Sequence, residues 1–170
     1  YIGRSFLNWT TVKAENPYHV KLTNIEGHSE VLSIIGEDVK NVIVEGFYFS
    51  NHDPSYTCST TREANVMVHI ESSSNVILRN NIFYGNDAQN TCNELLKINR
   101  ATATAYPRNI HIQGNVFYGR PSAGGTDLID SVRPGELDIY DNIFFELNSP
   151  SAQSFITIKR QAPSDLVANP

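Results

Sequence analysis

The sequence is poor in charge and sulfur and contains no long hydrophobic run. Only 18% of its 170 residues are charged, and it has two Cys, one Met and one Trp. Because no apolar stretch approaches the roughly 18 residues of a membrane-spanning helix, we expect no membrane span. The net charge of −5 argues against nucleic acid or an anionic membrane as the main partner. Ser, Thr and Asn are abundant instead, a composition common in extracellular proteins that handle carbohydrates.

The chain lacks the sequence motifs of several enzyme classes. His28, His52 and His111 have no metal-ligand spacing, and neither a Gly-rich phosphate loop nor a Ser, His and Asp arrangement is evident. We therefore expect neither a nucleotide enzyme nor a serine hydrolase.

What the chain does contain is a repeat. The segment NVIVEGFYF at 41–49 returns as NVILRNNIFY from Asn75, as NIHIQGNVFY from Asn109 and as ELDIYDNIFF from Glu136. The starts are 34, 34 and 27 residues apart, inside the range of about 20 to 50 residues that indicates a solenoid. The repeat therefore predicts a fold of similar, stacked coils.

Apolar and polar residues alternate within each copy, which is the periodicity of a β-strand with one buried face. The residues predicted to point inward are Val42 and Val44, Val76 and Leu78, Ile110 and Ile112, and Leu137 and Ile139. Polar residues such as Glu45, Arg79 and His111 occupy the alternate positions, which we expect to face solvent.

Two ladders are predicted at the end of each copy. Asn81, Asn115 and Asn142 share one phase, and Phe49, Phe83, Phe117 and Phe144 share the phase two residues later. Because Asn tolerates the left-handed backbone of a tight corner, we expect a strand, an Asn corner and a short strand with an inward Phe. Coils stacked about 4.8 Å apart would turn these positions into an Asn ladder and a Phe stack.

This pattern, N-x-I-x-x-N-x-F, resembles that of the pectate-lyase-like right-handed parallel β-helix superfamily, from about Trp9 to about Arg160. The passage TVKAENPYHVKLT, followed by VIVEGFYF, is similar to the opening coil of polysaccharide lyases of the chondroitinase B and alginate lyase type. The resemblance implies an all-β, right-handed parallel β-helix, of which this chain would be the N-terminal part. It is more specific for architecture than for chemistry.

Further strands are predicted between the repeats, at 30–36, 65–71, 94–100, 127–133 and 155–160. With three strands per coil, we expect five to six coils in a single domain spanning residues 1–170, which would be a fragment of a longer solenoid. Trp9 is expected to plug the core at the first coil.

The two cysteines lie at matching phases. Cys58 is 17 residues past Asn41, and Cys92 is 17 residues past Asn75. In successive coils they would lie close enough for a disulfide, although two free thiols are the alternative. A disulfide would imply an oxidising compartment, so we expect a secreted protein, extracellular or periplasmic.

The most promising site is the outward face of the second strands. Aligning Ile70, Ile98 and Ile158 as inward residues places a polar stripe outside, comprising His69, Glu71, Lys97, Asn99, Thr157 and Lys159, with Asp130, Ser131 and Arg133 nearby. This stripe is predicted to bind an acidic polysaccharide, with His69, Glu71, Asn99 and Asp130 as binding residues. The alternative is that these residues are ordinary solvated positions.

The resemblance also implies a chemistry for the stripe. In the lyases that the chain resembles, Ca²⁺ or basic side chains neutralise the uronate carboxylate, and Lys or Arg act as base and acid. By this analogy Lys97, Lys159 and Arg133 are the candidate catalytic residues. Glu71, Asp127 and Asp130 are the candidate ligands of a calcium ion.

Three functions follow from these expectations. The first is an enzyme, namely a polysaccharide lyase acting by β-elimination, with a glycoside hydrolase as the second choice. The second is a carbohydrate-binding module without catalysis, and the third is a structural protein that assembles end to end through its open coils.

Overall fold

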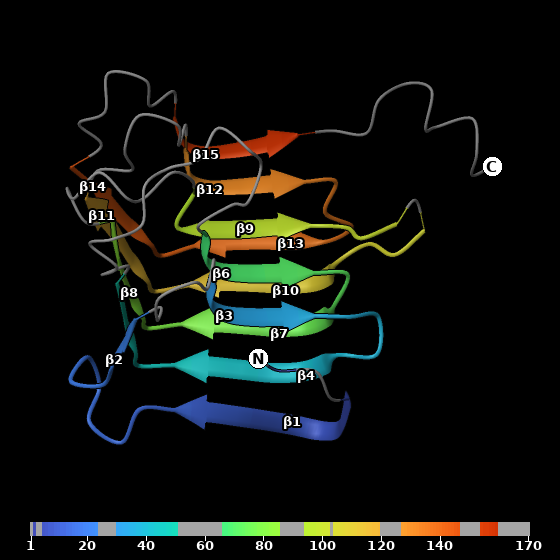
Figure 1. Ribbon diagram of the computed structural model, residues 1–170, viewed down its shortest axis with the longest axis horizontal. Coiled ribbons are helices and arrows are strands. Elements are labelled where there is room, and N and C mark those ends of the chain that lie inside the picture. Colours follow the sequence, from blue (N-terminus) through green and yellow to red (C-terminus); the bar gives the residue numbers. More distant parts are fainter. Residues whose placement is uncertain are drawn as a thin grey trace.

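The computed structural model describes residue 2 and residues 5–23, 30–50, 66–85, 94–102, 104–119, 127–146 and 154–159. These residues form three parallel sheets of five strands each, and no helix occurs among them. The chain visits the three sheets in turn, so that each round of three strands makes one coil (Figure 1). The predicted parallel β-helix is confirmed, with five coils in the described part of the chain.

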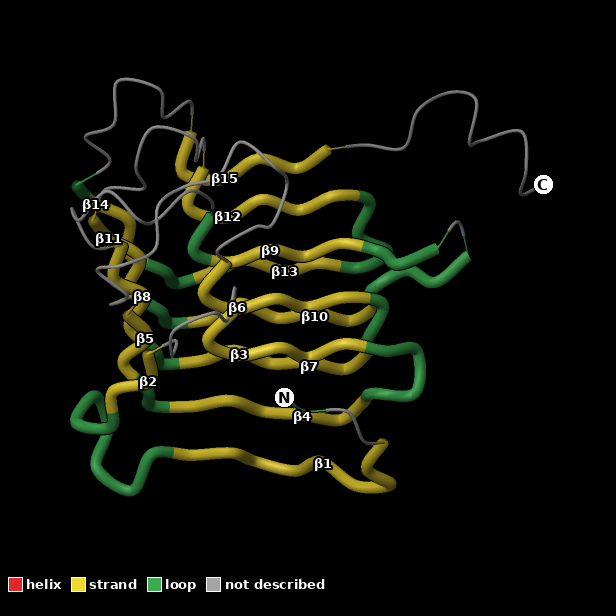
Figure 2. The backbone as a smooth tube through the Cα atoms, viewed as in Figure 1, coloured by secondary structure: helices red, strands yellow, loops and turns green. Residues whose placement is uncertain are grey.

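Each sheet contains one strand from every coil. Sheet A contains β3 (Glu30–Ile35), β6 (Val66–Glu71), β9 (Leu96–Asn99), β12 (Asp127–Val132) and β15 (Ser154–Lys159). Sheet B contains β1 (Ser5–Lys13), β4 (Lys40–Glu45), β7 (Ser74–Arg79), β10 (Arg108–Gln113) and β13 (Leu137–Tyr140). Sheet C contains β2 (Lys21–Thr23), β5 (Tyr48–Ser50), β8 (Ile82–Gly85), β11 (Val116–Gly119) and β14 (Ile143–Phe145). Figure 2 shows how turns join the strands of sheets A and B from coil to coil.

The interior rows run through equivalent positions of the repeat. Val44 pairs with Leu78, Leu78 with Ile112, and Ile112 with Ile139. The first three are almost completely buried, whereas Ile139, in the last coil, is only partly buried. The predicted inward face is therefore confirmed, because alternation along each strand combines with in-register pairing across strands.

The predicted Phe stack fills the core beside sheet C. Successive rings of Phe49, Phe83, Phe117 and Phe144 have centroids 5.0, 4.4 and 5.2 Å apart. The first three rings have no exposed surface. A second stack, which the repeat analysis did not identify, lies on the alternate positions and includes Tyr84, Tyr118 and Phe145.

The predicted Asn ladder forms, but its corner geometry differs from the expectation. Asn81 and Asn115 are completely buried, and neither has a positive φ. The left-handed backbone belongs to the preceding residue, which is Asn80 (φ 54°) before Asn81 and Gly114 (φ 62°) before Asn115. The corner is thus made by one residue, and the next residue is free to turn its amide inward for hydrogen bonding.

The ends of the helix are less covered than its middle. Trp9 is 47% exposed, so the expectation that it plugs the core is wrong. Trp9 lies in β1, the outermost strand of sheet B, where no described strand packs on its far side.

No helix in the described residues is long and apolar enough to cross a membrane.

Candidate functional site

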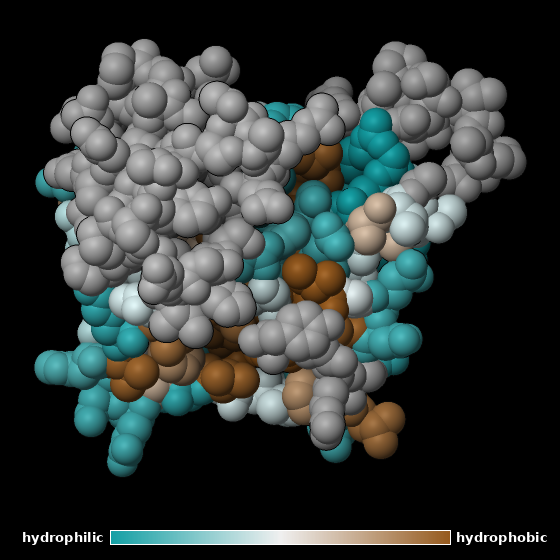
Figure 3. All heavy atoms as spheres, in the orientation of Figure 1, coloured by the Kyte–Doolittle hydropathy of each residue, from teal (hydrophilic) through white to brown (hydrophobic). Residues whose placement is uncertain are grey.

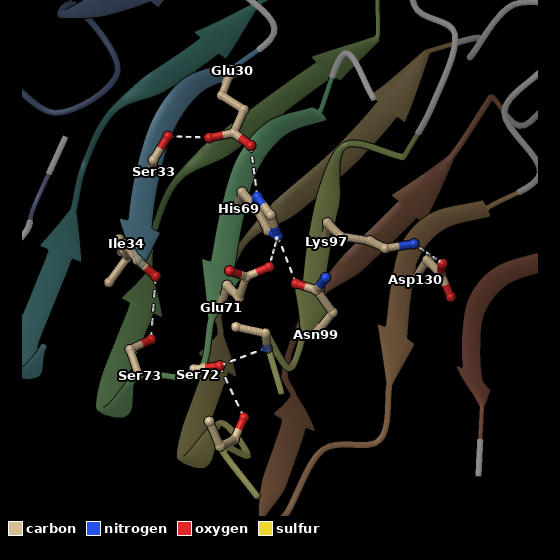
Figure 4. Close-up of polar contacts among 12 residues, drawn as sticks. Glu30, Ser33, Ile34, His69, Glu71, Ser72, Ser73, Lys97, Asn99 and Asp130 are labelled. Carbon is tan, nitrogen blue, oxygen red and sulfur yellow. Dashed lines mark hydrogen bonds and ion pairs between the residues drawn. The ribbon is translucent and has the colours of Figure 1, made fainter. Parts of the chain in front are cut away.

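The predicted polar stripe lies along the outer face of sheet A. Strand pairing aligns Ser33, His69, Lys97, Asp130 and Thr157 in one row across the five strands. A second, shorter row aligns Glu71 with Asn99. The alternate residues, including Ile70 and Ile98, are buried in the core, so the row must face outward. Figure 4 shows His69, Glu71, Lys97, Asn99 and Asp130 on one side of the sheet.

His69 is at the centre of a hydrogen-bonded group. Its Nδ1 lies 2.6 Å from Glu30 Oε1, and its Nε2 lies 2.6 Å from Asn99 Oδ1. Glu71 Oε2 is 3.7 Å from the same Nε2, and Ser33 Oγ donates a hydrogen bond to Glu30. Because both ring nitrogens face oxygen acceptors, the doubly protonated imidazolium satisfies both contacts.

The pKa values in this group follow from burial and pairing. Burial alone would lower the pKa of His69, but hydrogen bonds to Glu30 and Asn99 and the charges of Glu30 and Glu71 outweigh it and raise the pKa. Burial alone would raise the pKa of Glu30, yet its bonds to His69 and Ser33 lower it. The contact therefore favours the charged forms of both His69 and Glu30.

Asp130 joins two lysines from neighbouring coils. Lys97 in β9 and Lys159 in β15 both donate to Asp130 Oδ2, Lys159 at 2.8 Å. Asp130 is completely buried, and its Oδ1 has no hydrogen-bond partner among the described residues. Burial would raise the pKa of Asp130, but the two lysines lower it, and the pKa of Lys159 is raised by Asp130 in spite of partial burial.

Two acidic residues of this face were missed in the sequence analysis. Glu30 pairs with His69, and Glu94 Oε1 lies 3.7 Å from Lys97 Nζ. Glu94 is almost completely buried, and burial raises its pKa. Both residues stand at the beginning of a predicted second strand, in the same alignment as Asp127. That alignment was the signal that could have found them.

The remaining candidates do not converge. Arg133 follows β12 at a left-handed corner (φ 56°), outside the row, and its backbone N–H donates to Lys159 O. Ser131 pairs with Ile98 and points into the core, where it is completely buried. Cys58 and Cys92 lie outside the described residues, so their disulfide stays a prediction.

The three candidate calcium ligands have other neighbours. Glu71 is near His69, Asp127 Oδ1 accepts a 2.5 Å hydrogen bond from Ser154 Oγ, and Asp130 holds the two lysines. Within the described residues, no group of three or more His, Cys, Asp or Glu side chains is placed to hold a metal ion.

The site thus offers charged and amide side chains on one face, most of them engaged with one another. Of the two lysines that bind Asp130, Lys159 is the more accessible, because half of its side chain is exposed against 20% for Lys97.

No protein-family model, curated protein or solved structure matches this chain. The resemblance to pectate-lyase-like β-helices therefore stays a prediction from the sequence pattern.

Proposed function

We propose that this β-helix is a carbohydrate-binding protein that holds an acidic polysaccharide along the outer face of sheet A. The observation that carries the proposal is the convergence of Lys97 and Lys159 on the single oxygen Asp130 Oδ2. Each ammonium has three donors and gives one to Asp130, so donors remain for a carboxylate of the ligand. Glu94 also lies 3.7 Å from Lys97, but burial raises its pKa and so favours its neutral form, which leaves the two lysines as the groups that attract a polyanion.

The direction of the row supports a polymeric ligand. His69, Lys97 and Asp130 follow one another across strands about 4.8 Å apart, close to the length of one sugar unit. A chain lying across the strands would meet His69, Lys97 and Lys159, whose side chains are partly exposed, whereas Asp130 is buried. Figure 3 shows hydrophilic and hydrophobic surface side by side on this face.

Binding is better supported than β-elimination. A lyase needs a basic group to remove the C5 proton, but the carboxylate of Asp130 stabilises the charged form of Lys159 and raises its pKa. A fully protonated lysine binds a carboxylate well and accepts a proton poorly. Arg133, the proposed electrophilic partner, lies outside the row.

The alternative to simple binding is catalysis by Lys97, with or without a calcium ion. A secreted or periplasmic location is also part of the proposal, because the proposed ligands are extracellular polymers.

The test is a binding titration with alginate, pectate and chondroitin sulfate, with and without Ca²⁺, and with a neutral glucan for comparison. Lys159→Ala and Lys97→Ala should each weaken binding of the acidic polymers. Lys40→Ala is the matched control, because Lys40 is exposed in β4 of sheet B. Ultraviolet absorbance of an unsaturated uronate would identify a lyase instead. Absence of binding to all three acidic polymers, without such absorbance, would refute the proposal.

A further inference from the structure

The outer face of sheet A carries excess positive charge around Asp130. Lys97 and Lys159 both bind this residue, so that two ammonium groups stand against one carboxylate. Glu94 lies beside Lys97, but burial raises its pKa and favours its neutral form. The lysine group, made of Lys97, Asp130 and Lys159, therefore has one excess positive charge.

The opposite sign prevails around His69 on the same face. Glu30 Oε1 lies 2.6 Å from one ring nitrogen, and Glu71 Oε2 lies 3.7 Å from the other. Two carboxylates thus surround one imidazole, which leaves excess negative charge even when the ring is an imidazolium. Figure 4 shows the Lys97 side chain extending toward Asp130 and away from His69. Glu30, His69 and Glu71 therefore form an acidic group, which we call the histidine group.

The two groups follow each other along the direction in which a polymer would lie. Glu71 is in β6 and Asp130 is in β12, with β9 between these strands. Neighbouring strands are about 4.8 Å apart, so two steps cover roughly 10 Å, or about two sugar units. Asn99 of β9 pairs with Glu71 and carries no charge. A polymer whose carboxylate meets the lysine group therefore presents a sugar about two units away to the histidine group.

We propose that this face selects an acidic polysaccharide whose charged sugars are separated by neutral ones, and that Glu71 rejects an uninterrupted polyuronate. The inference rests on the function proposed above and names the class of polymer. The Glu71 side chain is 21% exposed, so its carboxylate can accept hydrogen bonds from the hydroxyl groups of a neutral sugar. A second uronate at this place brings two carboxylates together, and their repulsion disfavours the fully charged polymer.

Matched polymers that differ only in charge test the inference. Pectate and partly methyl-esterified pectin share one backbone, as do alginate and its partial propylene glycol ester. Esterification makes a fraction of the units neutral. At equal concentrations of free carboxylate, the unmodified chain should bind at least one of the esterified polymers more tightly than its fully charged counterpart.

Glu71→Gln removes the charge and keeps the shape of the side chain. It should strengthen binding of the fully charged polymer by about fivefold, the effect of one like charge about 4 Å away in water. Binding of the esterified polymer should hardly change. Glu71→Ala should give the same gain, and circular dichroism checks that both variants are folded. Asp138→Asn is the matched control, because it removes a carboxylate that is 68% exposed on sheet B.

Lys97→Ala distinguishes a loss of binding from a change of selectivity, because it should weaken binding of both polymers of a pair. Tighter binding of the fully charged polymers by the unmodified chain would overturn the inference and leave the proposed function intact. An equal gain for both polymers in Glu71→Gln, or no gain for either, would also overturn it. Absence of binding to all four polymers would overturn the inference and the proposed function together.

Discussion

Asn115 accepts two hydrogen bonds from Asn81 of the preceding coil, one from the backbone N–H at 2.9 Å and one from the side-chain Nδ2 at 3.1 Å. Its own Nδ2 donates to Leu78 O at 2.9 Å and to Asn142 Oδ1 at 3.1 Å. The same pattern recurs from coil to coil, so each Asn amide fixes the corner of its neighbour. These buried polar groups are fully paired, as a core position requires.

Replacing Asn115 by Ala should destabilise the helix strongly. The change leaves the buried Asn81 N–H without its partner, at a cost of about 1 to 3 kcal/mol. It also removes the hydrogen bond that Asn115 donates to the Leu78 carbonyl. Urea unfolding measures the loss. Asn142→Ala is the matched control at the partly exposed end of the ladder, where water can replace the lost bonds. Equal losses in the two variants would contradict the prediction.

Phe117→Ala should cost roughly 3 to 5 kcal/mol of unfolding free energy, because it opens a cavity in the core. The Phe117 ring is completely buried between Phe83 and Phe144. Phe145→Ala removes a ring that is 40% exposed and should cost clearly less. A negligible effect of Phe117→Ala would mean that the inward face is wrongly assigned.

Gly119→Ala should prevent normal folding of the fourth coil. Gly119 has φ 98°, and a Cβ there would lie 2.0 Å from the carbonyl oxygen of Gly85. Neither the backbone conformation nor the neighbouring backbone can accommodate it. The comparison variant is Gly36→Ala, where φ is also positive but the nearest atom is 3.5 Å away. The thermal midpoint of Gly119→Ala should be the lower of the two.

The pair of Glu30 and His69 should make stability depend on pH. The raised pKa of His69 means that its contribution is fully present below its ordinary pKa and is lost as the pH rises through the folded-state value. The lowered pKa of Glu30 means that its contribution is lost as the pH falls through its folded-state value. The pair should therefore stabilise the fold most between the ordinary pKa of glutamate, 4.5, and that of histidine, 6.5.

Histidine resonances followed by NMR, together with urea unfolding at several pH values, measure this dependence. His69→Gln should abolish the loss of stability at the alkaline side. An NMR pKa for His69 below the ordinary value of about 6.5 would contradict the assignment.

A disulfide between Cys58 and Cys92 is also expected from their matching phases. It would close a loop of about 34 residues and stabilise the fold by roughly 3 to 4 kcal/mol in the chain-entropy model. Peptide mapping without reduction identifies the bond, and its removal by reductant should lower the thermal midpoint. Two thiols that react with an alkylating agent in the native protein would rule it out.

The sequence by itself determined the coil. The alternation of Val42 and Val44 with polar residues specifies one buried face, and the 34-residue recurrence places Val76 and Leu78 on the same face of the next coil. Both are local or periodic signals, so no tertiary information is needed to read them. For the same reason, the outward placement of His69 and Lys97 could be predicted from the positions of Ile70 and Ile98.

Only the tertiary structure decided which polar residues pair. The sequence places Asp130 near Lys97, but it does not show that Lys159 reaches the same oxygen, or that Glu30, 39 residues before His69, holds its imidazole. Likewise, the left-handed φ falls on Asn80 and not on Asn81. Side-chain length, local twist and the phase of each corner set these contacts, and periodicity constrains none of them. A repeat fixes which residues share a face, whereas the geometry of that face fixes which charges neutralise one another.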